Sequence, residues 1–558
     1  MKRQICTEYG QIRSVADDLY QRPLGLLCPH ADWDVMLRDL PSMAKDRLGI
    51  MVCGPKGSGK STMCRLLANR ILTAPAGQTS KMDPTKSFVA FLDLDPGQPE
   101  FSAPGQISLV EMYSCNLGVP YTHPVPICPK GGRVLRAHHI GSSSPRDDPK
   151  HYLACVFDLL SSYQNLLTVH PRCPLLINSS GWIQGSGLDI LVHLIQHVLV
   201  TDVVSIYDDT WNLEGNRDFA NATMDACNTS QKRPCRIKSL GWNGGVSRTA
   251  SQLRMMQTFS YFHLDSSEAG QLRWNASPAT DMVPMFVPFA GPQQAIFASM
   301  ILGDEQAPEL LDCVLNGSLV GLVVIEDESA IPDAGQSLNT SARNSNEHSP
   351  CTLDEADAEI HEAGGPSRRS SSEDSVKNNA SCAQNKNPRK NDAAMPGNSN
   401  STDHLEHPSI HRTSKGIPYL PATSGITLPL NPSHSYCLGQ ALIQSIDYET
   451  KSFHLITPVP SSTLQTLHRE QRKILLVRGK LETPTWAYRE GLEYEKSRQR
   501  RREKHFRVDA SRPDEVVEAC LARQPWASIN RGKRKGSAKA RRVRRDIKYK
   551  SQASRDMN

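Results

Sequence analysis

A glycine-rich loop near the start of the chain constrains the fold more than any other feature of the sequence. The segment Gly54–Ser61 reads G-P-K-G-S-G-K-S and fits the pattern G-x-x-x-x-G-K-[ST] in full. The apolar run Leu48–Cys53 precedes it and predicts a strand, and the segment Thr62–Leu72 follows it with helical periodicity. Because a strand, a glycine loop and a helix form the context in which this loop binds phosphate, the sequence predicts a nucleoside-triphosphate site in a P-loop α/β core.

The loop is expected to supply three kinds of phosphate contact. Its glycines let backbone N–H groups turn toward phosphate oxygens, and the N-terminus of the following helix adds partial positive charge. Lys60 is expected to reach the β- and γ-phosphates, and Ser61 to ligate Mg²⁺. The predicted nucleotide-binding residues are Gly54, Pro55, Lys56, Gly57, Ser58, Gly59, Lys60, Ser61 and Thr62.

The basic charge of the chain is concentrated at its C-terminal end. Residues 496–558 hold 21 Lys/Arg and 7 Asp/Glu, a net charge of +14. The whole chain of 558 residues carries +6, which leaves 6 − 14 = −8 for the rest. Basic runs this dense are typical of nucleic-acid contact or of a nuclear or nucleolar address.

Cysteine usage and hydropathy argue against two other classes of protein. The fifteen cysteines form no C-x-x-C pair, which disfavours a zinc module and a secreted disulfide framework. No run of apolar residues is long enough to cross a membrane, so we expect no membrane partner.

Periodicity and composition divide the chain into four predicted parts. Residues 46–265 alternate strand-like runs with helices, which predicts a parallel sheet with helices on both faces. Residues 284–490 predict a smaller C-terminal domain that contains β-strands. It is interrupted at 326–415 by a segment too poor in large apolar side chains to fold, which predicts a disordered insertion. A short N-terminal remnant, 1–45, and a basic tail, 491–558, complete the predicted organisation.

Two carboxylates follow a buried strand of the predicted core. Asp93 and Asp95 come at the end of the run Phe88–Asp93. In P-loop enzymes an Asp at this strand end lies across from the glycine loop, where it can hold Mg²⁺ or accept a proton from the nucleophile. The residues by themselves leave both candidates open.

A glycine hinge followed by two arginines predicts a mobile cover over the phosphates. Gly244 and Gly245 precede Arg248 and Arg254, and guanidinium groups brought over a γ-phosphate would neutralise charge in the transition state. The sequence lacks guanine-reading and GTPase switch motifs, an ABC-type signature and a run of helicase motifs. Phosphoryl transfer to an acceptor is therefore favoured over a switch or a motor.

The order of these motifs resembles that of the polynucleotide 5′-hydroxyl kinases, and within them the nucleolar branch that acts in pre-ribosomal RNA processing. The segments 54–62, 92–101 and 244–262 look like the family's phosphate loop, second motif and lid. The segment 177–187, which reads I-N-S-S-G-W-I-Q-G-S-G, is similar to the family's Asn-Thr-x-Gly-Trp-x-x-Gly-x-Gly signature. A further segment, 139–152, resembles part of the nucleolar branch.

The resemblance implies a reaction and its cofactors. ATP, with Mg²⁺, would donate its γ-phosphate to the free 5′-hydroxyl of RNA. Lys60 would act on the phosphates, and Ser61 would hold the metal. Asp95 matches the family's base and metal-side carboxylate, with Asp93 as the second choice.

The resemblance also assigns roles on the acceptor side of the site. Arg248 and Arg254 would be catalytic residues of the lid, although their spacing is one residue longer than in the family. Gln98 and Trp182 would bind the substrate, and stacking of Trp182 on a base is physically reasonable.

Partners and location are implied by the resemblance alone. The nucleolar branch resembles proteins that assemble with a HEPN-type endoribonuclease, which cuts the second internal transcribed spacer and leaves the 5′-hydroxyl that this kinase would phosphorylate. The protein would then work in the nucleus and nucleolus. The alternative is an ATP-binding scaffold subunit that stabilises the nuclease, with phosphotransfer dispensable. The family usually carries a β-rich domain before the kinase core, where this sequence has only about 45 residues.

Overall fold

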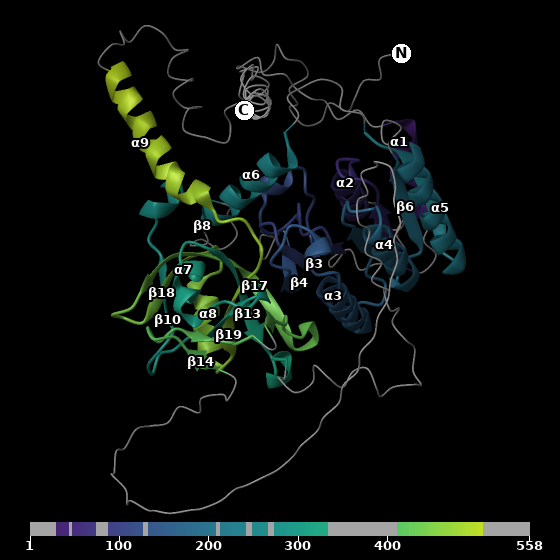
Figure 1. Ribbon diagram of the computed structural model, residues 1–558. Coiled ribbons are helices and arrows are strands. Elements are labelled where there is room, and N and C mark those ends of the chain that lie inside the picture. Colours follow the sequence, from purple (N-terminus) through teal and green to yellow (C-terminus); the bar gives the residue numbers. More distant parts are fainter. Residues whose placement is uncertain are drawn as a thin grey trace, which may run out of the picture. The chain divides into compact units, whose positions relative to one another are not determined.

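Two large β-sheets organise the part of the chain that the structure describes (Figure 1). The computed structural model describes residues 30–43, 47–73, 88–125, 132–207, 213–240, 248–265, 273–332, 410–422 and 425–505. The first sheet has seven strands and the second has eight. Within these ranges no helix has the length and apolar character needed to span a bilayer.

The first sheet has the strand order β4-β3-β2-β5-β1-β6-β7. Strands β2, β5, β1, β6 and β7 are parallel, which confirms the predicted parallel core. Strands β3 and β4 instead join one edge antiparallel, because the connection from β2 to β3 contains no helix and a parallel return needs a longer crossover. The strands are β1 (Gly49–Cys53), β2 (Val89–Asp93), β3 (Gln106–Met112), β4 (Gly132–His139), β5 (Leu175–Asn178), β6 (Asp202–Tyr207) and β7 (Arg233–Lys238).

Helices cover both faces of this sheet because its central strands are apolar on both sides. In β1, Met51 and Cys53 pack in a cluster with side chains of α3, α4 and α5, whereas Ile50 and Val52 pack in another with α1 and α2. The helices of this part are α1 (Ala31–Met43), α2 (Lys60–Leu72), α3 (Pro149–Val169), α4 (Ser186–His197), α5 (Leu213–Thr229) and α6 (Ala250–Phe262).

Helix α1 is packed into the core next to the phosphate loop. The Trp33 side chain is fully buried, and its Nε1 donates a hydrogen bond of 2.7 Å to the carbonyl of Lys238 at the end of β7. A Cβ placed on Gly59 would lie 3.1 Å from the Trp33 ring. The boundary predicted at residue 46 therefore falls inside one packed unit, while residues 1–29 lie outside the described residues.

The second sheet has the order β10-β18-β17-β13-β19-β11-β15-β14. Strand β13 pairs antiparallel with β17 and with β19, so chain segments from both sides of residues 333–409 meet in one sheet. The strands are β10 (Met285–Pro288), β11 (Ile296–Ile301), β13 (Leu319–Ile325), β14 (His411–Arg412), β15 (Pro418–Tyr419), β17 (Ser435–Asp447), β18 (Ser452–Ile456) and β19 (Lys473–Arg478).

Short elements complete the described chain. Two-stranded ladders join β8 (Leu264–Asp265) to β9 (Arg273–Trp274) and β12 (Gly303–Asp304) to β16 (Ile426–Thr427), and the remaining helices are α7 (Leu311–Leu315), α8 (Ser461–Arg469) and α9 (Thr485–His505).

The two ends of the insertion predicted at 326–415 have defined structure. A 3-10 turn spans Glu328–Ala330, and β14 begins at His411. The insertion between them, 333–409, lies outside the described residues, as does the part of the predicted basic tail that follows His505.

Candidate active site

The glycine loop joins β1 to α2 in a conformation that requires its glycines. Gly57 and Gly59 have φ angles of +82° and +102°, in the region that side chains disfavour. Gly54 passes so close to β6 that a Cβ there would lie 2.5 Å from the carbonyl oxygen of Ile206. The loop leads directly into the N-terminus of α2, which begins at Lys60. Backbone N–H groups and the helix dipole favour a phosphate at this position.

Lys60 is the buried cation of this loop. Its Nζ donates a hydrogen bond of 3.0 Å to the carbonyl of Pro55. Burial lowers the pKa of Lys60, and the nearby charge of Asp95 acts in the opposite direction. A Cβ placed on Gly181 would lie 3.1 Å from Lys60 Nζ and 3.1 Å from the Cα of Lys56. Gly181 thus packs so close to the loop that a side chain there would press on both lysines.

Three polar side chains form a corner next to the loop. Nδ2 of Asn178, at the end of β5, lies 2.9 Å from Asp93 Oδ1 and 3.4 Å from Ser61 Oγ. Asp93 Oδ2 accepts a hydrogen bond of 2.5 Å from the backbone N–H of Glu100. Burial raises the pKa of Asp93 to about 8, although these hydrogen bonds act to lower it. Hydroxyl and carboxylate oxygens are the ligands that Mg²⁺ prefers, so the corner of Ser61 and Asp93 fits that ion.

Asp95 lies two residues further along, in a more accessible position. Its Oδ1 accepts a hydrogen bond of 2.9 Å from the N–H of Gly97, and its side chain is only partly buried. A Cβ on Gly97 would lie 2.8 Å from the carbonyl oxygen of Ser143, so this turn packs against the segment after β4. Gln98, also partly exposed, follows in the same turn. The choice of Asp95 over Asp93 as base and as metal ligand stays a prediction. The accessibility of Asp95 supports the role of base, whereas Asp93 is the carboxylate that Asn178 joins to Ser61.

Trp182 combines packing with partial exposure. Its ring lies against the first turn of α4, where a Cβ on Gly187 would come within 2.5 Å of two ring atoms. The side chain also packs on the apolar cluster under α3 and α4 while part of it stays exposed. A role in substrate binding stays a prediction for Trp182, and its packing role is observed.

The predicted lid arginines lie at the N-terminal end of helix α6, Arg248 just before it and Arg254 in its first turns. Thr249 caps this helix through a capping box with Gln252. Arg248 is exposed, and its Nη1 lies 2.7 Å from the sulfur of Met256 in α6, whereas Arg254 is partly buried. The hinge residues Gly244 and Gly245 lie outside the described residues.

Comparison with known proteins identifies the relatives of this chain. Residues 54–264 match the family described as mRNA cleavage and polyadenylation factor CLP1 P-loop. Proteins named polynucleotide 5′-hydroxyl-kinase grc3 from Neosartorya fischeri and Aspergillus fumigatus are each 36% identical, over 86% of this chain and 54% of their own length. The chain is a homologue of the polynucleotide 5′-hydroxyl kinases. It spans about half the length of the curated relatives it matches.

These relatives confirm the predicted resemblance to polynucleotide 5′-hydroxyl kinases, and the family match confirms the predicted P-loop fold over residues 54–264. A chain in the structure of the wild-type Clp1p–Pcf11p complex is 12% identical, with a TM-score of 0.43 over 80% of this chain and 78% of that chain. That likeness is too weak to support an argument.

Sequence reasoning missed the roles of two polar residues in this kinase homologue. Asn178 bridges Ser61 and Asp93, and its place at the end of a buried apolar run was the available signal. Glu100 is completely buried and holds Asp93 through its backbone. Its partners come from distant parts of the chain, so no local pattern pointed to it.

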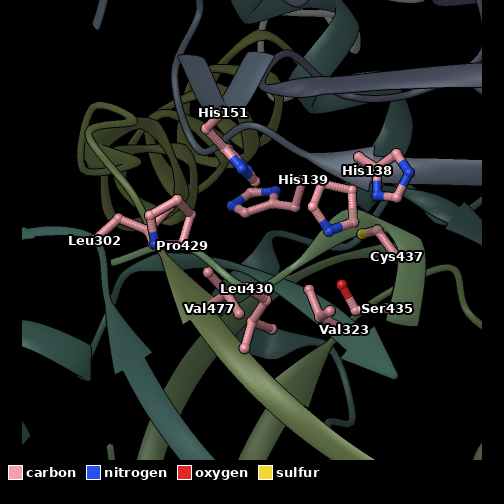
Figure 2. A pocket seen from close by; sticks show the side chains of 11 residues that line it. His138, His139, His151, Leu302, Val323, Pro429, Leu430, Ser435, Cys437 and Val477 are labelled. Carbon is pink, nitrogen blue, oxygen red and sulfur yellow. The ribbon is translucent and has the colours of Figure 1, made fainter. Parts of the chain in front are cut away.

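A second polar cluster lines a pocket between β4 and the second sheet (Figure 2). His138 and His139, which end β4, line it with His151 of α3 and with Val323 and Cys437 of the second sheet. Burial lowers the pKa values of His139 and His151 to about 4. Among the described residues no group of three or more His, Cys, Asp or Glu is arranged to hold a metal ion. We refer to this pocket and the residues that line it as the seam.

Proposed function

We propose that this protein is an ATP-dependent polynucleotide 5′-hydroxyl kinase that transfers the γ-phosphate of ATP to the 5′-hydroxyl of RNA. One observation carries the proposal. The buried Lys60 and the oxygen corner of Ser61 and Asp93 converge at the carboxyl ends of neighbouring parallel strands, with Asp95 close by in the turn that follows β2. Such an arrangement holds a triphosphate and its metal on one side and leaves a carboxylate for an acceptor on the other.

The reaction divides among these residues as follows. Lys60 and the loop N–H groups hold the β- and γ-phosphates, and Ser61 with the corner carboxylate would hold Mg²⁺, which supplies charge neutralisation at the phosphates. Asp95 accepts the proton of the 5′-hydroxyl as its oxygen bonds to the γ-phosphorus. The bond from that phosphorus to the bridging oxygen breaks, and ADP leaves. Arg248 and Arg254, the predicted lid residues, neutralise charge on the transferred group.

The proposal extends to the setting of the reaction. The basic tail supports an RNA substrate, and the names of the relatives support a 5′-hydroxyl end as the acceptor. By resemblance to the nucleolar branch, the substrate is pre-ribosomal RNA cut in its second internal transcribed spacer, the partner is a HEPN-type endoribonuclease, and the location is the nucleolus. Gln98 and Trp182 contact the RNA end.

The test is transfer of label from γ-labelled ATP to a 5′-hydroxyl RNA oligonucleotide. We expect labelling by the wild type and a loss of roughly a thousandfold or more in Lys60→Ala, because the buried cation acts on the transferred phosphoryl. Arg70→Ala, which changes an exposed cation on the same helix, is the matched control and should label normally. ATP consumption without labelled RNA would show the kinase proposal to be wrong and would leave the scaffold alternative.

A further inference from the structure

Glu100 sits where three parts of the site meet, although it touches neither the loop nor a phosphate position itself. It is the last acidic residue of the turn that follows β2, and its side chain is completely buried. A buried carboxylate costs several kcal/mol unless it is well paired. The contacts that compensate it show what the residue connects.

The first connection runs to the phosphate-loop helix. Arg65 of α2 lies 3.2 Å from Glu100 Oε1 through its Nε, and the same Nε donates a hydrogen bond of 3.3 Å to the carbonyl of Ser61. The side chain of Glu100 therefore fixes the first turn of α2, which carries Lys60 and Ser61. At the same time its backbone N–H holds Asp93 Oδ2 at 2.5 Å. One residue thus sets the spacing between the loop helix and the corner carboxylate.

The second connection runs to the segment that follows β3. His123 Nε2 lies 2.9 Å and Asn116 Nδ2 lies 3.1 Å from Glu100 Oε1. Asn116 is bound in turn to Asn69 of α2 through two hydrogen bonds, of 2.7 Å and 2.8 Å. Arg65 also donates to the carbonyl of Gly118 in this segment. The segment 113–123 is therefore clamped between α2 and Glu100.

The third connection reaches helix α6, which carries Arg254 and follows directly on Arg248 and Thr249. Ser260 of α6 donates a hydrogen bond of 2.5 Å to the carbonyl of Tyr121, which lies next to His123. Gln257 of α6 donates one of 2.8 Å to the carbonyl of Ser102, two residues after Glu100. Helix α6 is thus anchored on both of the segments that Glu100 holds.

We propose that Glu100 is a positioning residue, which sets the loop helix, Asp93 and helix α6 at fixed spacings for phosphoryl transfer. This inference rests on the proposed kinase function. The residue contacts no reacting atom, so its effect passes through the groups it holds. Residues of this kind change the rate of the chemical step more than they change ground-state binding, because the transition state depends on alignment.

Glu100→Gln tests the proposal, with Glu111→Gln as the matched control. Glu111 of β3 is an equally buried carboxylate. It pairs with Arg133 at 2.9 Å and 3.0 Å and accepts a hydrogen bond from the Tyr113 hydroxyl, but within the described residues no hydrogen bond or ion pair joins it to the side chains through which the three connections run. We expect Glu100→Gln to lower kcat for RNA labelling by about tenfold or more, the loss typical of outer-shell partners, with KM for ATP little changed. Glu111→Gln should destabilise the protein but keep its kcat.

Amide hydrogen exchange provides a readout that does not depend on activity. In Glu100→Gln, exchange should quicken in residues 116–123 and in α6. In Glu111→Gln, whose contact to this part of the chain is Tyr113, it should not. If Glu100→Gln does not fold, His123→Gln should shift kcat and exchange in the same direction.

The outcomes separate the two proposals. If the wild type labels no RNA, the kinase proposal fails, and the exchange comparison alone decides whether Glu100 links the three parts. If the wild type labels RNA but Glu100→Gln keeps its kcat, or loses no more of it than Glu111→Gln, the positioning role is overturned.

Discussion

Buried polar side chains occur in two regions of this molecule, and the two regions treat them in opposite ways. At the carboxyl ends of β2 and β5, Asp93 and Asn178 are enclosed and hydrogen-bonded to each other. At the seam between β4 and the second sheet, His139 is just as enclosed, yet neither ring nitrogen has a hydrogen-bond partner among the described residues. The first region is held by specific polar pairs, and the second by shape and by keeping a side chain uncharged.

The difference predicts two kinds of mutational effect. Where polar pairs set the geometry, a substitution of nearly equal size should change chemistry while the fold persists. Where shape sets the geometry, an added methyl group or an added proton should lower the free energy of unfolding. The reaction rate should then fall only because less of the protein is folded. Three experiments, in order of decreasing expected effect, test this division.

Exchanging the two candidate carboxylates for amides should give the largest effect. Asp95→Asn removes the predicted proton acceptor and should lower kcat for RNA labelling by roughly a hundredfold to ten-thousandfold, the usual contribution of a general base. Asp93→Asn leaves the acceptor in place and should instead raise the Mg²⁺ concentration needed for half-maximal rate. Labelling measured at saturating ATP over a Mg²⁺ titration distinguishes the two.

Thermal unfolding of the two amide variants serves as their control, and both should remain folded. Should Asp93→Asn abolish labelling at all Mg²⁺ concentrations while Asp95→Asn retains it, the two roles are exchanged. Asp93, the second choice for the base, then becomes the acceptor.

The contrast between the regions also bears on what could be predicted from sequence. The strands at Leu175–Asn178, Leu319–Ile325 and Ser452–Ile456 were predictable because each is a nearly continuous apolar run between polar segments. Strands β3 and β4 escaped prediction because they carry charged side chains, such as Glu111 and Arg133, that pair only after the strands meet. Their polarity is compensated by tertiary structure, which local periodicity does not report.

The candidate site shows the same limit. The glycine loop and the turn after β2 are local patterns, so the sequence alone is enough to predict Lys60 and Asp95 as site residues. Glu100, in contrast, contacts His123, which is 23 residues away in the sequence, and Arg65, which is 35 residues away. Contacts over such separations depend on how strands and helices pack, and no spacing rule in the sequence encodes them.

At the seam, Gly321→Ala should give an intermediate effect that falls on stability. A Cβ at this position of β13 would lie 2.4 Å from Cγ and 2.7 Å from Cβ of His139, atoms next to the backbone of β4 that cannot yield without moving the strand. Overpacking of this kind costs about 1–3 kcal/mol of unfolding free energy, which urea unfolding can measure. Nucleotide binding and kcat of the folded fraction should be unchanged.

Gly491→Ala in α9 is the matched control, because its nearest neighbour is the end of a Thr280 side chain at 3.3 Å. That variant should be neutral or slightly stabilising, since Ala favours the helix by up to about 1 kcal/mol over Gly. If the two variants are equally destabilised, or if folded Gly321→Ala loses kcat, the proposed difference between the two regions is wrong.

The smallest effect concerns the pH dependence of stability at the same seam. Burial lowers the pKa values of His139 and His151 to about 4, below the value of 6.5 expected in the unfolded chain. Between these values the unfolded state binds more protons, so stability is complete above pH 6.5 and falls as the pH drops toward 4. Each histidine can contribute up to about 1.4 kcal/mol per pH unit in that window.

Urea unfolding at pH 7.5 and pH 5.5 should be compared in the wild type and in His139→Asn. The difference between the two proteins isolates the contribution of His139 to the pH dependence of stability, because the other titrating groups are common to both. The wild type should lose more stability than the variant on acidification, by about 1 kcal/mol over this interval. His138 is a poorer choice for the test, since its Nε2 lies 2.7 Å from Asp158, which favours its protonated form in opposition to burial. Equal losses in the two proteins would mean that His139 gains a proton-accepting partner in the folded state, and the seam would then follow the same rule of polar pairing as the carboxyl ends of β2 and β5.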